Sequence, residues 1–261
     1  MVVDRLCIFL VLLGIAASSR GQNPPEPLEA RKAIAELFPT VEIRSNGEFT
    51  WIPAEAEKTI FKPDAGGFCH TILDTVFYYE QYGTAMALMV FITFNFDEYE
   101  IESCHACAPH TGLATYRKMP DGSWTKANFR KSAMQSGAWG QPGDSRILKL
   151  SPQGDYVFIA GMAYTATGNM ISIETWIDTD RYGEIFRIEL LDEYPSGCAG
   201  RCDQDWCYEF RSTVRKVSLL PKPTAWSDLM VETKVLSCKN PEEKTSAKYH
   251  FDGLKYVNSG D

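Results

Sequence analysis

Short runs of apolar and β-branched residues, separated by turn residues, make up most of this chain. The runs TAMALMVFITFNF, DYVFIAGMAYTA, MISIETWID and DLMVETKVLS are typical, and turns such as PDG at 120–122 and PQG at 152–154 separate them. β-Branched and aromatic residues favour strands, and frequent short turns favour antiparallel pairing. The pattern predicts a mainly β protein, either an antiparallel sandwich or a strongly bent meander.

One segment near the N-terminus has a helical pattern instead. EARKAIAELF places Ala33, Ile34, Leu37 and Phe38 at helical spacing, which predicts one short N-terminal helix. The next segment, VEIRSNGEFTWI, has two alternating halves around an Asn-Gly pair, which is the strongest short hairpin signal. The turn glycines further along have no fixed interval, which argues against a regular repeat protein.

The first residues predict export. Residues 6–17 form an apolar run of twelve, which is too short to span a bilayer, and the small residues Ser19 and Gly21 follow. This is the pattern of a secretory signal peptide with cleavage after Ser19 or Gly21. We therefore expect residues 1–21 to be removed and residues 22–261 to form a single mainly-β domain. The expected location is periplasmic or extracellular.

The charge and the composition of the chain limit the classes of molecule that it can bind. The formal net charge is −8 and basic residues are scattered, which argues against nucleic acid and anionic membrane surfaces as partners. No second apolar run of membrane-spanning length exists, so we expect a soluble mature protein. The six Trp and twelve Tyr residues would offer a contact surface for a protein or a carbohydrate wherever they are exposed. The sequence does not define the oligomeric state.

Cysteine use follows from the expected compartment. Cys7 lies in the leader, so seven of the eight cysteines remain, and disulfides are expected with one possible free thiol, Cys69. Antiparallel pairing centred on the Pro-Lys-Pro turn at 221–223 would set Cys207 opposite Cys238, within bridging range. Cys198 and Cys202 would then close the GCAGRC loop, and a bridge from Cys202 to Cys69 is the alternative.

The stretch ESCHACAPH, residues 102–110, carries the strongest chemical signal. Three interpretations compete for it. Cys104 and Cys107 can form a structural staple, or they can form a redox pair with His105 between them. They can also join His110 in a C-x-x-C-x-x-H zinc site, with Cys69 or His70 as the fourth ligand.

A structural staple between Cys104 and Cys107 is the interpretation that we favour. Redox folds place a long helix after the motif, whereas here a run that is broken by Gly112 and two Thr residues leads to a Pro-Asp-Gly turn. The acidic segment before the motif disfavours a thiolate. An oxidising compartment favours a disulfide over zinc. We therefore expect no cofactor, with the redox and zinc sites as alternatives.

The other motifs in the sequence give weaker evidence for a functional site. DTDRYGEIFRIE places Asp178, Asp180, Gly183 and Glu189 at calcium-loop positions, but Tyr182 occupies a ligand position and the flanks look like strands. A turn with two solvated aspartates is the better interpretation. The familiar hydrolase and nucleotide-binding motifs do not occur in the sequence.

CHACAP, the strand and DGSW turn after it, and the segment AWGQP together resemble exported bacterial proteins of unassigned function that carry a CHACxP box. The resemblance covers residues 85–169, about a third of the chain. It implies export and a β-rich fold, and it implies no activity. The cysteine-rich segment 198–207 is not a feature of that group.

These observations predict an exported, soluble, disulfide-containing β protein that acts as a non-enzymatic binding or envelope-associated module. One alternative is a thiol-disulfide oxidoreductase that uses Cys104 and Cys107. Another is an inhibitor of an extracellular hydrolase, for which the sequence offers no specific motif.

Overall fold

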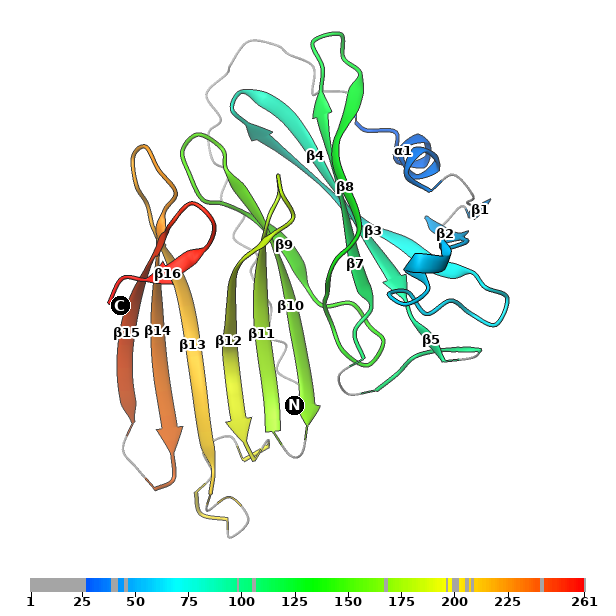
Figure 1. The fold of residues 1–261 in the computed structure, drawn as a ribbon. Helices are drawn as coiled ribbons and strands as arrows, with labels where there is room; N and C mark the ends of the chain where they lie inside the picture. The colour runs from blue at the N-terminus through cyan, green and yellow to red at the C-terminus, as the bar shows by residue number, and fades with distance from the viewer. Residues whose placement is uncertain are drawn as a thin grey trace, which may run out of the picture.

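The computed structural model describes residues 27–38, 42–44, 47–97, 99–104, 107–166, 169–195, 197–198, 202–204, 207, 209–239 and 242–260. Over these residues, the strands form two large antiparallel sheets and a small hairpin, with one α-helix near the start (Figure 1). The prediction of a mainly β protein with a short N-terminal helix is confirmed. The predicted signal peptide lies outside the described residues. None of the helices in the described ranges is long and apolar enough to cross a membrane.

The first sheet has the strand order β1-β2-β3-β4-β7-β8, and all its neighbouring strands are antiparallel. Helix α1 (Ala30–Leu37) covers one face, where Ile34 and Leu37 share a buried cluster with Phe49 and Trp51. The bounds of the elements are β1 (Glu42–Ile43), β2 (Glu48–Trp51), a 3₁₀ helix (Glu55–Glu57), β3 (Cys69–Gln81), β4 (Thr84–Phe94), β7 (His110–Lys118) and β8 (Trp124–Gln135), and the small hairpin consists of β5 (Phe96–Asp97) and β6 (Glu100–Ile101).

The second sheet is a meander in which each strand from β9 to β16 pairs with the next one along the chain. The pairing between β12 and β13 is short, because it covers only residues 191–194 and 211–214. The strands are β9 (Ser145–Lys149), β10 (Tyr156–Ala166), β11 (Asn169–Asp178), β12 (Glu184–Tyr194), β13 (Arg211–Leu220), β14 (Asp228–Ser237), β15 (Glu243–Phe251) and β16 (Tyr256–Asn258).

The two sheets pack face to face along β4 and β10. Leu88 and Val90 of β4 are fully buried in one cluster with Phe158 and Ala160 of β10. The alternate side chains of β4, such as Phe91, point to the other face and join the cluster beneath α1. Because β4 is covered on both faces, its sequence is a continuous apolar run and not an alternating one.

The second sheet also curls upon itself. Trp176 of β11 lies 5.5 Å from Phe186 of β12 and 6.4 Å from Tyr256 of β16, measured between ring centroids. β16 is five places from β11 in the strand order, so this contact requires strong curvature. Both predicted descriptions therefore apply: two sheets pack as a sandwich, and one of them is a strongly bent meander.

Candidate functional site

The two cysteines of the CHAC motif form a disulfide in a tight turn between the β5–β6 hairpin and β7. Their Cα atoms lie 4.9 Å apart, and the amide of Cys107 donates a hydrogen bond to the carbonyl of Cys104 at 3.0 Å. Cys104 is exposed and Cys107 is half-buried. His105 lies outside the described residues. The structure thus contains the bond that a structural staple requires.

The chain after this disulfide enters a strand and not a helix. β7 begins at His110, three residues after Cys107, so no helix N-terminus in the described residues faces either sulfur to stabilise a thiolate. Glu102, just before the motif, forms an ion pair with Lys62 at 2.7 Å. The Lys62 ammonium offsets the charge of this carboxylate, so the pair gives no net charge beside the motif. The described surroundings give the redox interpretation no support.

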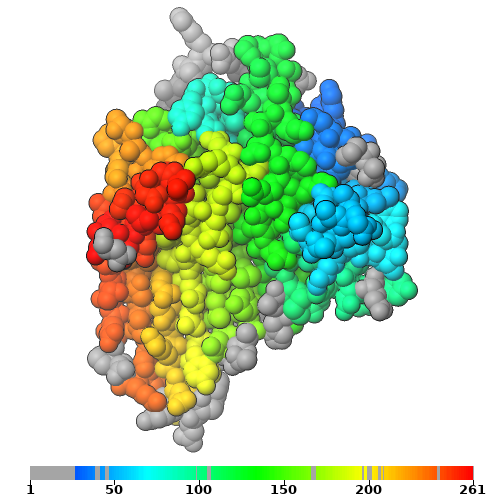
Figure 2. Space-filling model, viewed as in Figure 1, coloured from blue at the N-terminus to red at the C-terminus, as the bar shows by residue number. Residues whose placement is uncertain are grey.

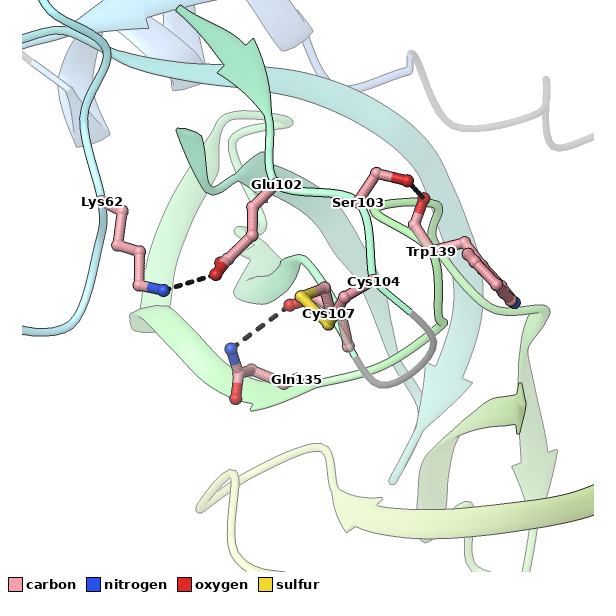
Figure 3. Close-up of a disulfide and its surroundings, with 8 residues drawn as sticks. Lys62, Glu102, Ser103, Cys104, Cys107, Gln135 and Trp139 are labelled. Atoms are coloured by element: carbon pink, nitrogen blue, oxygen red, sulfur yellow. Dashed lines mark hydrogen bonds and ion pairs between the residues drawn. A yellow bond between two sulfur atoms is a disulfide. The ribbon is translucent and has the colours of Figure 1, made fainter. Parts of the chain in front are cut away.

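A second loop packs against the disulfide turn and presents Trp139 (Figure 3). The amide of Trp139 donates to the carbonyl of Cys104 at 3.0 Å, and the amide of Gly140 donates to the carbonyl of Cys107 at 2.8 Å. The hydroxyl of Ser103 donates to the carbonyl of Trp139 at 3.5 Å. These bonds tie the two loops together at both cysteines.

The backbone of the second loop is held in an uncommon conformation. Trp139 has a φ of +57°, in the left-handed region that residues other than glycine rarely adopt, and its side chain remains 45% exposed. Gly140 follows with a φ of +69°, and a Cβ atom there would lie 2.7 Å from the carbonyl oxygen of Glu102. Glycine therefore allows the close approach. The indole ring points away from the disulfide in Figure 3.

Sequence reasoning did not single out Trp139. The segment GAWGQP carries one usable signal, because Gly137 and Gly140 flank the Ala-Trp pair and both have positive φ. Two such glycines indicate a tight, fixed loop, but they do not say which neighbour the loop will contact. The contact with the CHAC turn arises from the pairing of β7 with β8, since the two loops lie at the same end of that pair.

The structure does not bring the proposed zinc ligands together. His110 is buried, with its ring 4.9 Å from the ring of Phe61 and its Nδ1 atom 2.9 Å from the hydroxyl of Ser132. Burial lowers the pKa of His110. His70 instead contacts Asp64 through Nε2, at 2.7 Å. Among the described residues, no three His, Cys, Asp or Glu side chains form a group that could hold a metal ion.

Cys69 is the free thiol of the described residues, as the sequence analysis expected. It is fully buried at the start of β3, in the same cluster as Trp51 and Phe91. Burial raises the pKa of its thiol to about 12, and the nearby Glu57 carboxylate acts in the same direction. The side chain is therefore a core residue and is not available as a ligand or a nucleophile.

The pairing predicted for the other four cysteines is wrong. The structure joins Cys198 to Cys207 and Cys202 to Cys238, with Cα separations of 5.6 and 5.3 Å. The connection between β13 and β14 is longer than the Pro-Lys-Pro turn, and Arg211 pairs with Ser237. This register sets Cys238 beside residue 210, where its amide donates to a carbonyl at 3.2 Å. Cys207 lies outside β13, in the segment that precedes the strand.

The possible calcium loop is a turn, as expected from the sequence, but the expectation of two solvated aspartates is wrong, because Asp178 is buried and only Asp180 is exposed. The Oδ1 atom of Asp178 accepts hydrogen bonds from the amides of Asp180 and Arg181 at 2.7 and 3.2 Å. Its Oδ2 atom accepts a bond from Nε of Arg181 at 2.9 Å. Both oxygens of this buried carboxylate are thus occupied by the turn itself, and the flanking elements β11 and β12 are strands.

Comparisons with models of protein families, with characterised proteins and with solved structures found no match to this chain. The candidate site is therefore defined by its own geometry. It consists of an exposed tryptophan on a tight loop, hydrogen-bonded to a disulfide turn that is held between two strands.

Proposed function

We propose that this chain is an exported, non-enzymatic binding module that contacts a protein partner through Trp139. The contact surface, termed the stapled surface, comprises the exposed side chains of Trp139 and Ile101. Ile101 precedes the Cys104–Cys107 turn, and the Trp139 loop is hydrogen-bonded to that turn. The observation that carries the proposal is the exposed indole on a loop whose backbone is bonded to both cysteine carbonyls. The three disulfides support the export part of the proposal, because such bonds persist in oxidising compartments.

A fixed tryptophan suits a protein contact for two reasons. Trp is enriched among the residues that dominate binding energy at protein interfaces. A loop whose backbone is already held by hydrogen bonds loses little conformational entropy when it binds. Ile101 on the neighbouring hairpin is 39% exposed and adds apolar area to the stapled surface, which favours a protein over a carbohydrate.

The partner test uses a photo-crosslinking amino acid at position 139 and, as a control, at position 254. Leu254 is also exposed, at 70%, and lies on the turn between β15 and β16. A protein crosslinked only from position 139 in the native host is then purified, and its binding to the W139A and L254A variants is measured. We expect W139A to weaken binding roughly 30-fold, equivalent to about 2 kcal/mol, and L254A to have little effect. Equal effects of the two substitutions would refute the stapled surface as the contact.

The export part is tested by the intact mass of protein secreted by the native host. The mature chain should begin at Arg20 or Gln22, directly after the two expected cleavage positions. Recovery of an uncleaved chain from the cytoplasm would contradict export.

The rival function, a thiol-disulfide oxidoreductase, is tested by redox titration of the Cys104–Cys107 pair. A structural disulfide should have a reduction potential below about −300 mV, whereas disulfide-exchange enzymes lie between roughly −270 and −120 mV. We expect the lower value, because the described residues place no helix N-terminus at either sulfur. A potential in the enzymatic range would replace the binding proposal with the redox one.

A further inference from the structure

A cleft of about 520 Å³ opens between the two sheets, on the side of β8. Apolar side chains of both sheets form part of its lining, namely Ala133 and Met134 of β8, Met162 of β10 and Ile173 of β11, and polar side chains such as Thr175 lie among them. The four apolar side chains are only partly buried. The green surface of β8 meets the yellow surface of β12 along the middle of the face shown in Figure 2. The volume lies in the range of about 300–1,000 Å³ that is typical of small-molecule pockets.

A bulge in β8 shapes the β8 wall of this cleft. Thr111 pairs with Met134, but Leu113 pairs with Arg130, so three residues of β8 lie opposite Gly112 alone. A Cβ atom at Gly112 would lie 2.6 Å from the carbonyl oxygen of Lys131, so this position requires glycine. The extra residues allow both Ala133 and Met134, which are neighbours in sequence, to line the cleft.

Lys131, inside the same bulge, turns to the opposite face of the sheet. Its Nζ atom binds both carboxylate oxygens of Glu57, at 2.8 and 3.0 Å, and lies 4.3 Å from the centre of the Trp51 ring. Lys131 therefore packs against the cluster beneath α1, whereas its neighbour Arg130 lines the cleft.

The rim of the cleft is positively charged although the whole protein has a net charge of −8. Arg130 donates from Nη1 to the carbonyl of Tyr182 at 3.0 Å, and Arg187 of β12 lines the same cleft. Neither guanidinium forms an ion pair with a carboxylate of the described residues. Glu184 is the one acidic side chain among the described lining residues. Apolar side chains of both sheets thus lie beside two cations that have no anionic partner among the described residues.

We propose that this cleft binds a single-chain amphiphile with an anionic head, of the fatty-acid type. The apolar chain lies on Met134, Met162 and Ile173, and the carboxylate is held between Arg130 and Arg187. A guanidinium presents parallel donors that match a carboxylate, and this geometry gives charge-assisted bonds. Methionine side chains adapt to chains of different shape, which suits the floor of such a site. The cleft borders the Trp139 loop, because Met162 and Ile173 also line a second pocket together with Trp139. The proposal for the cleft does not depend on the function proposed for the stapled surface.

The first test is a titration of the full mature protein with dodecanoate below its micelle concentration, followed by NMR of the methionine methyl groups. We expect saturable shifts at Met134 and Met162. Met119, which is 39% exposed in the turn between β7 and β8, should not shift. Equal shifts at Met119, or the lack of saturation, would contradict a defined site and indicate adsorption to apolar surface.

The second test distinguishes the contribution of the anionic head of the ligand from that of its apolar chain. Dodecyltrimethylammonium has the same chain with a cationic head and should bind at least ten-fold more weakly than dodecanoate. The exposed Arg187 is replaced in the R187Q variant, and K149Q removes an exposed cation of β9 as the matched control. We expect R187Q to weaken dodecanoate binding about ten-fold and K149Q to leave it unchanged. Equal binding of the two amphiphiles, or equal effects of the two substitutions, would overturn the proposal.

Discussion

The CHAC turn and the segment between β12 and β13 both contain disulfides, and they can be compared directly. The Cys104–Cys107 bond spans a sequence separation of 3 and lies between two strands that are already paired within their sheets. The other two bonds span separations of 9 and 36, and they join the segment between β12 and β13 to itself and to the end of β14. One region is thus locally stapled, and the other is tied across the sheet.

The difference shows which interactions stabilise the conformation of each region. Beside the CHAC turn, backbone hydrogen bonds from Trp139 and Gly140 already fix the geometry. Among the described residues of the segment between β12 and β13, the buried cluster is much smaller, and its buried members are Cys198, Cys207 and Phe210. We therefore expect the two disulfides to contribute more to the stability of this segment than the Cys104–Cys107 bond contributes to the CHAC turn, because they close longer loops.

The largest effect is expected from removal of the bond between Cys202 and Cys238. Replacing both residues with Ala should lower the free energy of unfolding by about 4 kcal/mol, since chain-entropy loss grows with the length of the closed loop. Denaturant unfolding of the variant and the native protein measures this difference. If the loss is no larger than that caused by replacing Cys104 and Cys107 with Ala, the segment between β12 and β13 does not depend on its disulfides more than the CHAC turn does.

A slightly smaller effect is expected for the bond between Cys198 and Cys207. Its shorter loop contributes about 2.5 kcal/mol by chain entropy. Both sulfur atoms are fully buried, so the double Ala variant should lose about 1 kcal/mol more through packing. The same unfolding experiment applies, and a free energy of unfolding equal to that of the native protein would show that the small cluster holds without its disulfide.

Removal of the CHAC disulfide should cost only about 1.5 kcal/mol of unfolding free energy. Its main effect in the variant with C104A and C107A should be local. The amides of Trp139 and Gly140 donate to the two cysteine carbonyls, so their hydrogen exchange should accelerate, while amides of β10 keep their protection. Unchanged exchange at positions 139 and 140 would show that the staple does not hold the Trp139 loop.

The smallest effect is expected at Cys69, which is buried and has no disulfide partner in the part of the chain that the structure describes. Because burial raises the pKa of this thiol to about 12, iodoacetamide should leave the native protein unmodified at mildly alkaline pH. After unfolding without reductant, one thiol per mature chain should react. Modification of the native protein, mapped to Cys69 by mass spectrometry, would contradict this expectation.

Several elements of the fold could be predicted because their burial follows a simple pattern. The apolar run of β4 is buried on both faces, and the helix at Ala30–Leu37 shows its buried face at helical spacing. β8 could not be recognised in the same way. Its sequence WTKANFRKSAMQ is mostly polar, because it is an edge strand with a bulge and few of its side chains are buried. An edge strand is defined by its neighbour, and its own sequence carries little signal.

The candidate site was predictable only in part, for a related reason. The spacing of Cys104 and Cys107, together with the expected compartment, was enough to favour a staple. The sequence indicated no partner for the turn, whereas the pairing of β7 with β8 brings Trp139 to it. The side-chain direction of His110 was likewise undetermined, because the register of β7 decides which face of the sheet it joins.

The sequence by itself determined the local properties of this protein: its strand content, its single short helix and the presence of cysteines suited to disulfides. These depend on residues close together in the chain, through propensity and spacing. Tertiary structure decided which cysteines meet, which tryptophan is exposed and where two arginines line a cleft between the sheets. Such contacts depend on turn length, register and bulges, and the change from a three-residue turn to the longer connection between β13 and β14 was enough to give Cys238 a different partner.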